Sequence, residues 1–408
     1  MKKYITTIIC LLLYLFMFGQ ASITGEIRPR SEFRQRYQKP ISEENSPAFF
    51  INQRSRLNLS YISEKYDALL SVQDVRVWGD EKFNTYNASM ALHEAWIRYK
   101  ITKELSVKAG RQTIDLDNKR LMSAANWNQT SKKHDAVAFN YKHENFTIDF
   151  ISAFNQSSEK LSSTDYSDGQ GNYKYLSTLW INKKTKQFDA TAFALIDGFE
   201  PATDTLYNRI TYGAIVKYNL EKVMFTARCF GQGGENSNAQ SVSAWLLNAE
   251  AELKLDKHKL IVGTEILSGN DLQNPDGKSH TFEMPYGAKH AFNGTMDYFK
   301  KSSETKNCGL TDCYLKWSCS ISKTGKLGAD IHWFSTTQTY SVVDEDYKKY
   351  LASECDILYK KSISKGINFE CGYSFLKGSS TLQELKGGDA AKLNHWAYVM
   401  LTFKPVFL

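Results

Sequence analysis

After residue 18 the chain contains no apolar run long enough to cross a membrane as a helix, which takes roughly 18 to 20 residues. Proline is scarce, at 7 of 408 residues, and the chain has neither a Cys-x-x-Cys pair nor a cysteine–histidine cluster. Arginine is missing from the C-terminal part, because all twelve arginines lie between Arg28 and Arg228. The lack of a long apolar run argues against a helical membrane protein. The lack of cysteine and histidine clusters leads us to predict no metal, and we predict no other cofactor.

Signatures of catalysis and of nucleic-acid binding are missing as well. None of the eight histidines lies in a recognisable nucleophile or metal motif, so we expect no enzymatic activity and no catalytic residue. The net charge is +7, and about +5 without Lys2 and Lys3, which is too small for a nucleic-acid partner. The oxygen-rich stretch 270–277 could hold Ca²⁺, but it lacks the spacing of an EF-hand loop, and an ordinary turn-rich loop is favoured.

The N-terminus has the features of a secretory signal peptide. Two lysines precede an apolar run over residues 4–18, and small or polar residues at 19–21 fit a cleavage site. A retained N-terminal anchor is the less favoured alternative. We therefore predict a signal peptide over residues 1–20 and a single exported domain over residues 21–408.

Six cysteines remain after the signal peptide. An even number permits disulfides in an exported protein, but most of them share the apolar phase of an alternating segment. We therefore favour small hydrophobic side chains over disulfides, and the pairing stays open. The six are Cys229, Cys308, Cys313, Cys319, Cys355 and Cys371.

Residues 23–37 alternate strictly between charged and less polar side chains. One set is Glu26, Arg28, Arg30, Glu32, Arg34 and Arg36, and the residues between them are mostly apolar. A period of two indicates a strand, because successive side chains point to opposite faces of a sheet. Two folds give this pattern: a soluble sheet with one wet face, and a membrane barrel with a wet lumen.

Similar alternating segments of about ten residues recur as far as residue 403, and short polar connections alternate with long ones. We count about eighteen segments, and an even number with this layout is typical of bacterial outer-membrane barrels. The predicted fold is therefore all-β: a transmembrane antiparallel β-barrel of about 18 strands, with short periplasmic turns and long extracellular loops. We place it in the cell outer membrane, surrounded by lipid and favoured as a monomer. A soluble exported glycan-binding β protein is the alternative.

Two stretches interrupt the rhythm, residues 111–135 and residues 268–307. Both are too long for tight turns and rich in polar residues. Two alternatives stay open for each: an inward fold that narrows a pore, and an ordinary surface loop.

Three stretches give the chain a resemblance to a known family. They are Gln73-Asp74-Val75-Arg76-Val77-Trp78-Gly79; Gly110-Arg111-Gln112 followed by Arg120, Trp127 and Asp135; and residues 265–271 with residues 290–299. Through them the chain resembles the alginate export channels, in the form found in Bacteroidetes, from about Gly25 to the C-terminus. The resemblance implies an eighteen-stranded outer-membrane barrel with a basic, arginine-lined lumen that passes a polyuronate.

Ten arginines are candidates for binding such a substrate, because a guanidinium group can pair with a carboxylate through two parallel hydrogen bonds. They are Arg28, Arg30, Arg34, Arg36, Arg54, Arg56, Arg76, Arg98, Arg111 and Arg120. The predicted function is passive passage of an anionic saccharide or polyuronate. Two alternatives stay open: the arginines brace the wall through salt bridges, and the channel is a general porin that prefers small anionic solutes.

Overall fold

The structure, a computed structural model, describes residues 19–41, 45–81, 89–166, 172–201, 205–342 and 345–408. Residues 1–18, which make up most of the predicted signal peptide, lie outside this part of the chain, so the signal peptide stays a prediction. Among the described residues, no helix is long and apolar enough to cross a membrane.

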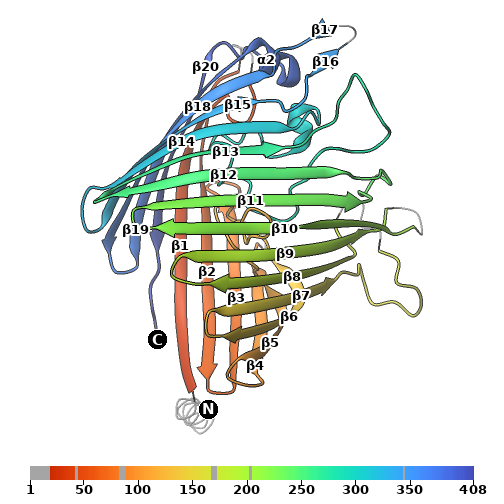
Figure 1. The fold of residues 1–408 in the computed structure, drawn as a ribbon. Coiled ribbons are helices and arrows are strands. Elements are labelled where there is room, and N and C mark those ends of the chain that lie inside the picture. Colours follow the sequence, from red (N-terminus) through yellow and green to blue (C-terminus); the bar gives the residue numbers. More distant parts are fainter. Residues whose placement is uncertain (1–18, 42–44, 82–88, 167–171, 202–204, 343–344) are drawn as a thin grey trace.

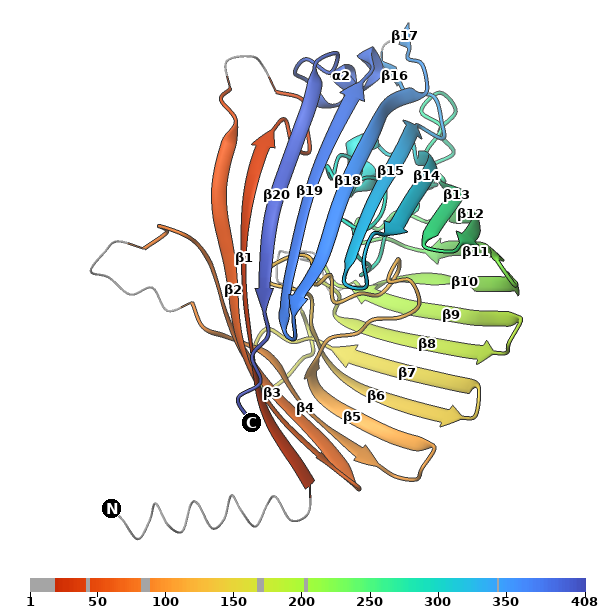
Figure 2. The same ribbon diagram turned by 90° about the vertical axis from the view of Figure 1, so that its left-hand side faces the viewer.

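Eighteen antiparallel strands form one closed sheet, in which strands that follow each other along the chain are paired and β20 pairs with β1 (Figures 1 and 2). The strands of the barrel are β1 (Gly19–Gln35), β2 (Ala48–Ser63), β3 (Tyr66–Val77), β4 (Ala91–Lys100), β5 (Leu105–Gln112), β6 (His134–His143), β7 (Phe146–Phe154), β8 (Tyr175–Lys184), β9 (Phe188–Phe199), β10 (Tyr207–Leu220), β11 (Val223–Gly234), β12 (Ala244–Leu255), β13 (His258–Leu267), β14 (Leu310–Ser320), β15 (Gly325–Ser335), β18 (Tyr350–Ser364), β19 (Ile367–Gly378) and β20 (Leu393–Phe403). The predicted barrel of about 18 strands is confirmed.

The connections differ in length at the two rims of the barrel. At one rim they are tight turns, such as residues 64–65, 144–145 and 256–257, and both the start of β1 and the end of β20 lie at this rim. At the other rim they are long and include a hairpin of β16 (Ser341–Val342) and β17 (Glu345–Asp346), the 3-10 helix η1 (Ser302–Thr305) and the helix α2 (Ser380–Lys386). This is the layout of short periplasmic turns and long extracellular loops.

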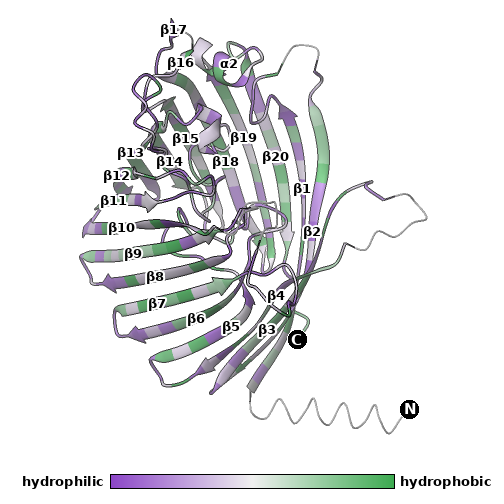
Figure 3. Ribbon diagram, turned by 90° about the vertical axis from the view of Figure 1, so that its right-hand side faces the viewer, coloured by the Kyte–Doolittle hydropathy of each residue, from purple (hydrophilic) through white to green (hydrophobic). Residues whose placement is uncertain are grey.

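The phase of the strands separates a membrane barrel from a soluble sheet. On β1 the charged Arg28 and Arg30 are buried, at 5% and 6% exposure, whereas Ile27 is 47% exposed. On β20 Trp396 is buried and Val399 is 47% exposed. Apolar and polar residues alternate in the same way along the other strands (Figure 3). A soluble protein would bury the apolar face instead, so the outer wall faces lipid.

Candidate functional site

The connection between β5 and β6, residues 113–133, folds into the barrel and is called the first inner loop below. Its Asp117 accepts hydrogen bonds from Trp180 Nε1 of β8 at 2.8 Å and from Thr191 Oγ1 of β9 at 2.9 Å. Its Arg120 pairs with Glu265 of β13, on another part of the wall. Because the loop contacts several walls of the barrel, it crosses the interior.

Buried arginines of the first two strands hold the tip of this loop. Arg28 donates hydrogen bonds to Gln129 Oε1 at 2.7 Å and to the carbonyl oxygen of Asn126 at 2.8 Å. Arg54 donates to Asn126 Oδ1 at 2.9 Å, and its Nε donates to Glu26 Oε1 at 2.7 Å. The donors of these two guanidinium groups are therefore largely taken by groups of the protein itself.

Arg30 and Arg34 share one carboxylate. Arg30 lies 2.8 Å and Arg34 also 2.8 Å from opposite oxygens of Glu32, which is 1% exposed. Arg30 also donates to the carbonyl oxygen of Trp127 at 3.0 Å, and its guanidinium carbon lies 4.3 Å from the centre of the Trp127 ring. Arg34 keeps about a third of its side chain exposed toward the interior.

The remaining candidate arginines are spread over different surroundings. Arg56 donates to Gln73 Oε1 at 2.7 Å, and Arg98 lies 3.6 Å from a carboxylate oxygen of Asp67; both are half-buried on the inner face. Arg36 lies just beyond the end of β1, with φ +64°, and donates to a loop carbonyl.

Arg76 and Arg111 point away from the interior. Arg76 pairs across the sheet with Gln53, one position from the inward-facing Arg54, and successive positions face opposite sides. Arg111 pairs across the sheet with Asp135, and the two side chains form an exposed ion pair at 2.8 Å. The substrate-binding role predicted for the ten arginines stays a prediction, and the structure does not bring these two together with the others.

The connection between β13 and β14, residues 268–309, is a second inner loop. Its Tyr286 donates to Asp197 Oδ2 of β9 at 2.7 Å, and the amide of Met296 donates to Glu354 Oε1 of β18 at 2.8 Å. Gly294 lies against the same carboxylate with φ +77°, where an added Cβ would be 2.5 Å from Glu354, so the close approach requires glycine.

The two inner loops join inside the barrel. Lys132 Nζ of the first loop donates to the carbonyl oxygen of Gly287 in the second at 2.7 Å. The rings of Trp127 and His290 stack with centres 4.3 Å apart. Of the alternatives left open for these segments, the structure therefore supports the inward fold, with both loops joined into one bridge across the interior.

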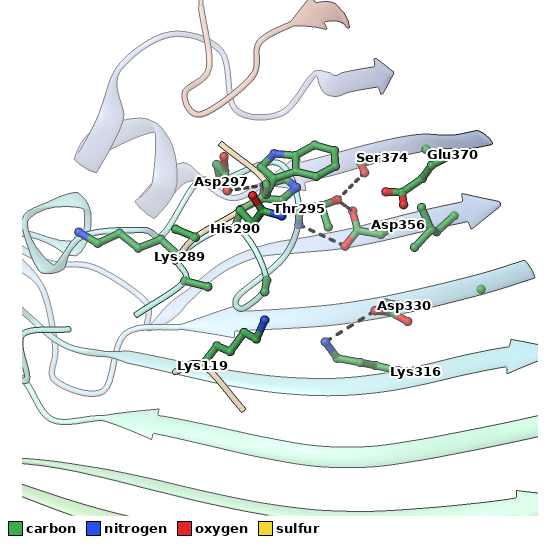
Figure 4. A pocket seen from close by; sticks show the side chains of 18 of the residues that line it. Lys119, Lys289, His290, Thr295, Asp297, Lys316, Asp330, Asp356, Glu370 and Ser374 are labelled. Carbon is green, nitrogen blue, oxygen red and sulfur yellow. Dashed lines mark hydrogen bonds and ion pairs between the residues drawn. The ribbon is translucent and has the colours of Figure 1, made fainter. Parts of the chain in front are cut away.

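A chamber of about 730 Å³ lies between this bridge and the wall formed by strands β13 to β20 (Figure 4). Nine lysines and four carboxylates line it. The lysines are Lys119, Lys132, Lys259, Lys289, Lys300, Lys301, Lys316, Lys326 and Lys360, and the carboxylates belong to Asp297, Asp330, Asp356 and Glu370. No arginine lines this chamber. The excess of lysine makes it strongly positive.

The lysines of the chamber differ in whether a nearby carboxylate neutralises their charge. Lys316 lies 3.6 Å from Asp330, and Lys360 lies 2.9 Å from Glu370. In the described part of the chain, neither Lys289 nor Lys326 forms an ion pair with a carboxylate. These two ammonium groups can therefore meet an anion that enters the chamber.

Burial weakens the charge of the lysines at the bridge. Desolvation, together with the nearby charge of Lys289, lowers the pKa of Lys132 to about 8. Desolvation and the charge of Lys301 lower the pKa of Lys289 as well. Since each lysine makes its neighbour harder to charge, an anion between them would restore the charged state.

A second cavity of about 500 Å³ continues from the chamber toward the short turns. It shares Lys326 and Lys360 with the chamber and adds Lys323 and Lys361. The two cavities thus form a path lined by lysines along one wall, from the bridge to the periplasmic rim.

The sequence prediction did not name these lysines as site residues. For the wall lysines a signal was available, because Lys259, Lys316 and Lys326 each lie in the phase opposite to the apolar residues of their strands. For Lys132 and Lys289 no local signal existed, since a loop has no periodicity that says where it folds. In the described part of the chain, no group of three or more His, Cys, Asp or Glu residues could hold a metal ion.

A closed eighteen-stranded wall that is apolar outside, with a charged, loop-narrowed interior, defines an outer-membrane β-barrel channel. The model of the alginate export family matches residues 20–345, more than half of the chain, so the chain belongs to that family. No curated protein sequence matches the chain. Nothing in these comparisons supports a particular bacterial group, and the Bacteroidetes form stays a prediction.

Several solved outer-membrane channels have the same fold. OccK9 (OpdG) of Pseudomonas aeruginosa matches with a TM-score of 0.64 and 11% identity, over 95% of this chain and 99% of that one. OccAB1 of Acinetobacter baumannii matches with a TM-score of 0.64 and 10% identity, over 95% and 97%. OpdL of P. aeruginosa matches with a TM-score of 0.61 and 14% identity, over 95% and 99%. At such low identity the likeness shows the fold alone.

Proposed function

We propose that this protein is a passive, anion-selective channel for an acidic saccharide or polyuronate, and that the lysine-lined chamber is where the solute is held during passage. The observation that carries the proposal is the chamber itself, in which nine lysines face four carboxylates. An arginine-rich lumen, expected from the family resemblance, belongs to this proposal only through the half-exposed Arg34, Arg56 and Arg98.

Lysine suits transit better than arginine does. An ammonium group is a strongly hydrated point charge on a flexible stem, whereas a guanidinium fork holds a carboxylate in a fixed geometry. A conducting site must bind its solute weakly enough for release. Lys289 and Lys326 have no carboxylate partner in the part of the chain that the structure describes. They offer such weak contacts one after the other along the path from the bridge to the periplasmic rim.

The wall strengthens the effect of these charges. A low-dielectric barrel focuses the field of charges inside it, so a positive chamber attracts anions and repels cations. Salt weakens this attraction, because the Debye length falls from about 10 Å at 0.1 M to about 3 Å at 1 M. We therefore expect anion selectivity at low salt and little selectivity at high salt.

The test is the reversal potential of single channels in planar bilayers across a KCl gradient, at low and at high mean concentration. Soluble alginate fragments, other uronates and uncharged oligosaccharides are then added in turn. The proposal expects an anion-selective sign at low salt and current block by the uronates only. A cation-selective channel would contradict it, and an anion-selective channel that no uronate blocks would indicate a general porin for small anions.

A further inference from the structure

The chamber continues toward the long connections as a narrow neck of about 30 Å³. The neck lies between the strand ends of β13 and β14 and two arms of the second inner loop, residues 281–284 and 299–305. Lys289, Lys300 and Lys301 line both cavities, so the neck and the chamber adjoin. A cavity of this size holds roughly one or two water molecules, so the neck in this structure is too narrow for a sugar.

The neck runs between two buried apolar clusters. Phe282 of the first arm belongs to a cluster with inward residues of β6 to β12, and Phe299 of the second arm belongs to a cluster with inward residues of β14 to β20. The hydroxyl-bearing Ser268, Thr281 and Ser302 line the neck between these clusters. Moving a charged solute through a packed apolar cluster is costly, so this polar seam is the favoured route from the chamber to the extracellular side.

The lining of the neck carries several cations and a single carboxylate. Lys289, Lys300 and Lys301 reach it, and Glu283 is the one acidic residue among those that line it. Figure 4 shows the ammonium end of Lys289 pointing away from Lys316, toward the side of the long connections. Desolvation and the charge of Lys301 lower the pKa of Lys289, whereas the negative charge of Glu283 opposes that shift. The carboxylate therefore acts directly on a lysine of the chamber.

Glu283 closes the neck by joining its two arms. Its carboxylate accepts a hydrogen bond from Ser302 Oγ at the start of η1. Its backbone is fixed to β11, because its amide donates to Gln232 Oε1 at 2.9 Å and its carbonyl oxygen accepts from Gln232 Nε2 at 2.7 Å. In the second arm Phe299 packs against Phe334 of β15, with ring centres 4.7 Å apart. Both arms are thus anchored to the wall, and the contact between Glu283 and Ser302 spans the gap.

An acidic saccharide has the groups that opening this contact requires. Its carboxylate can pair with the lysines of the neck, and its hydroxyl groups can donate to Glu283 and accept from Ser302. Chloride offers the charge but no donor. We propose that the neck is the extracellular exit of the chamber and that Glu283 determines which solutes leave, because a solute passes only by displacing Glu283 from Ser302. This inference rests on the function proposed above.

The first test places a thiol at neighbouring positions of η1 in the full-length protein. Ser302→Cys lines the neck, whereas Ser303→Cys, one position further, is exposed and does not line it. An anionic methanethiosulfonate reagent is added to single channels in KCl, and mass spectrometry confirms the labelling. We expect the current through Ser302→Cys to fall several-fold and the current through Ser303→Cys to stay unchanged. The wild type should be insensitive, because none of its six described cysteines lines the neck.

The second test changes Glu283. Glu283→Gln keeps an oxygen that can accept from Ser302, so only the charge is lost and anion selectivity in KCl should rise. Glu283→Ala removes the contact as well, so chloride conductance should rise several-fold. The ratio of galacturonate to chloride permeability, measured from bi-ionic reversal potentials, should fall several-fold in Glu283→Ala. Glu235→Gln, at an exposed carboxylate just after β11, is the matched control and should behave as the wild type does.

Heat-modifiable migration shows that each variant is folded. A labelled Ser302→Cys channel with unchanged current would overturn the proposal, and so would an equal loss of current in Ser303→Cys. A Glu283→Ala variant with the conductance and the permeability ratio of the wild type would overturn the role of Glu283. If the wild type is silent, Glu283→Ala must conduct, and silence in both would also overturn the proposal. A lack of anion selectivity would instead contradict the function proposed above, because the thiol test reads the loss of current whichever ion carries it.

Discussion

The two cation-rich walls of this barrel put their charges to different uses. On β1 and β2 the inward cations are arginines, and the buried Arg28, Arg30 and Arg54 hold the first inner loop by donating to its carbonyl and amide oxygens. On the wall from β13 to β18 they are lysines that line an open chamber, and Lys326 has no carboxylate partner in the part of the chain that the structure describes.

The difference follows from the chemistry of the two side chains. A guanidinium group has five donors in a rigid plane and can satisfy several acceptors of a folded loop at once. An ammonium group is compact, hydrated and flexible, so it suits contacts that form and break. The number of basic residues along a lumen therefore says little about solute binding until it is known which donors are already used.

The largest expected effect is on stability. Arg54→Leu removes the closest ion-pair partner of the buried Glu26 and leaves it only Lys404 at 3.7 Å, and removing one member of a buried ion pair typically costs about 3–5 kcal/mol. Lys289→Gln removes a cation that has no carboxylate partner among the described residues, and it should change the free energy of unfolding by less than about 0.5 kcal/mol. Denaturant unfolding in phospholipid vesicles measures both. If both variants lost the same free energy of unfolding, the arginines would not be more important for stability than the lysines of the chamber.

The next effect is on conductance. Replacing residues 270–305 by a short Gly-Ser turn removes the second inner loop and with it Lys289, Lys300 and Lys301. Because the loop occupies the interior, single-channel conductance should rise several-fold and anion selectivity should fall. Arg28→Gln serves as a comparison, since it loosens the first loop and should give noisier currents at nearly unchanged mean conductance. Identical conductance after the replacement would mean that the second loop does not limit the pore.

A smaller effect separates the lysines from the arginines directly. Lys132→Gln, Lys289→Gln and Lys326→Gln combined should move the reversal potential toward zero and weaken block by uronates. Arg34→Gln with Arg56→Gln, which alters the adjoining wall of β1 and β2, should move it much less. If the arginine variant loses more selectivity than the lysine variant, the solute path follows the wall of β1 and β2 instead.

The smallest effect is a dependence on pH. Burial brings the pKa of Lys132 down to about 8, so this lysine is charged below that pH and becomes neutral as the pH rises through it. A lysine in water stays charged to about pH 10.4. The reversal potential should therefore shrink between pH 7 and pH 9 in the wild type, and Lys132→Gln should flatten that change. A pH-independent wild type would show that Lys132 does not contribute.

The alternation of polar and apolar residues in the sequence also indicates which face of a strand each arginine occupies. The prediction of ten binding arginines does not take this phase into account. Arg111 alternates with the polar Lys108 and Gln112 and shares its phase with Val107 and Ala109, which face lipid. Arg76 shares its phase with Val72, another outward residue. Residue type alone makes both arginines candidates for substrate binding, whereas the phase of their neighbours indicates the outer face.

By itself, the sequence determined the fold class, the number of strands, the lipid-facing phase and the two rims, because alternation and turn spacing are local properties that every strand repeats. Only the tertiary structure decided that both long connections fold inward, that arginines hold one of them, and that lysines from four strands and two loops meet in one chamber. Those contacts join residues more than a hundred positions apart, such as Arg28 with Gln129 and Arg120 with Glu265. No local pattern in the sequence specifies which acceptor a buried donor will contact across the interior. These hydrogen bonds depend on the position of every strand in the closed barrel, so only the tertiary structure defines them.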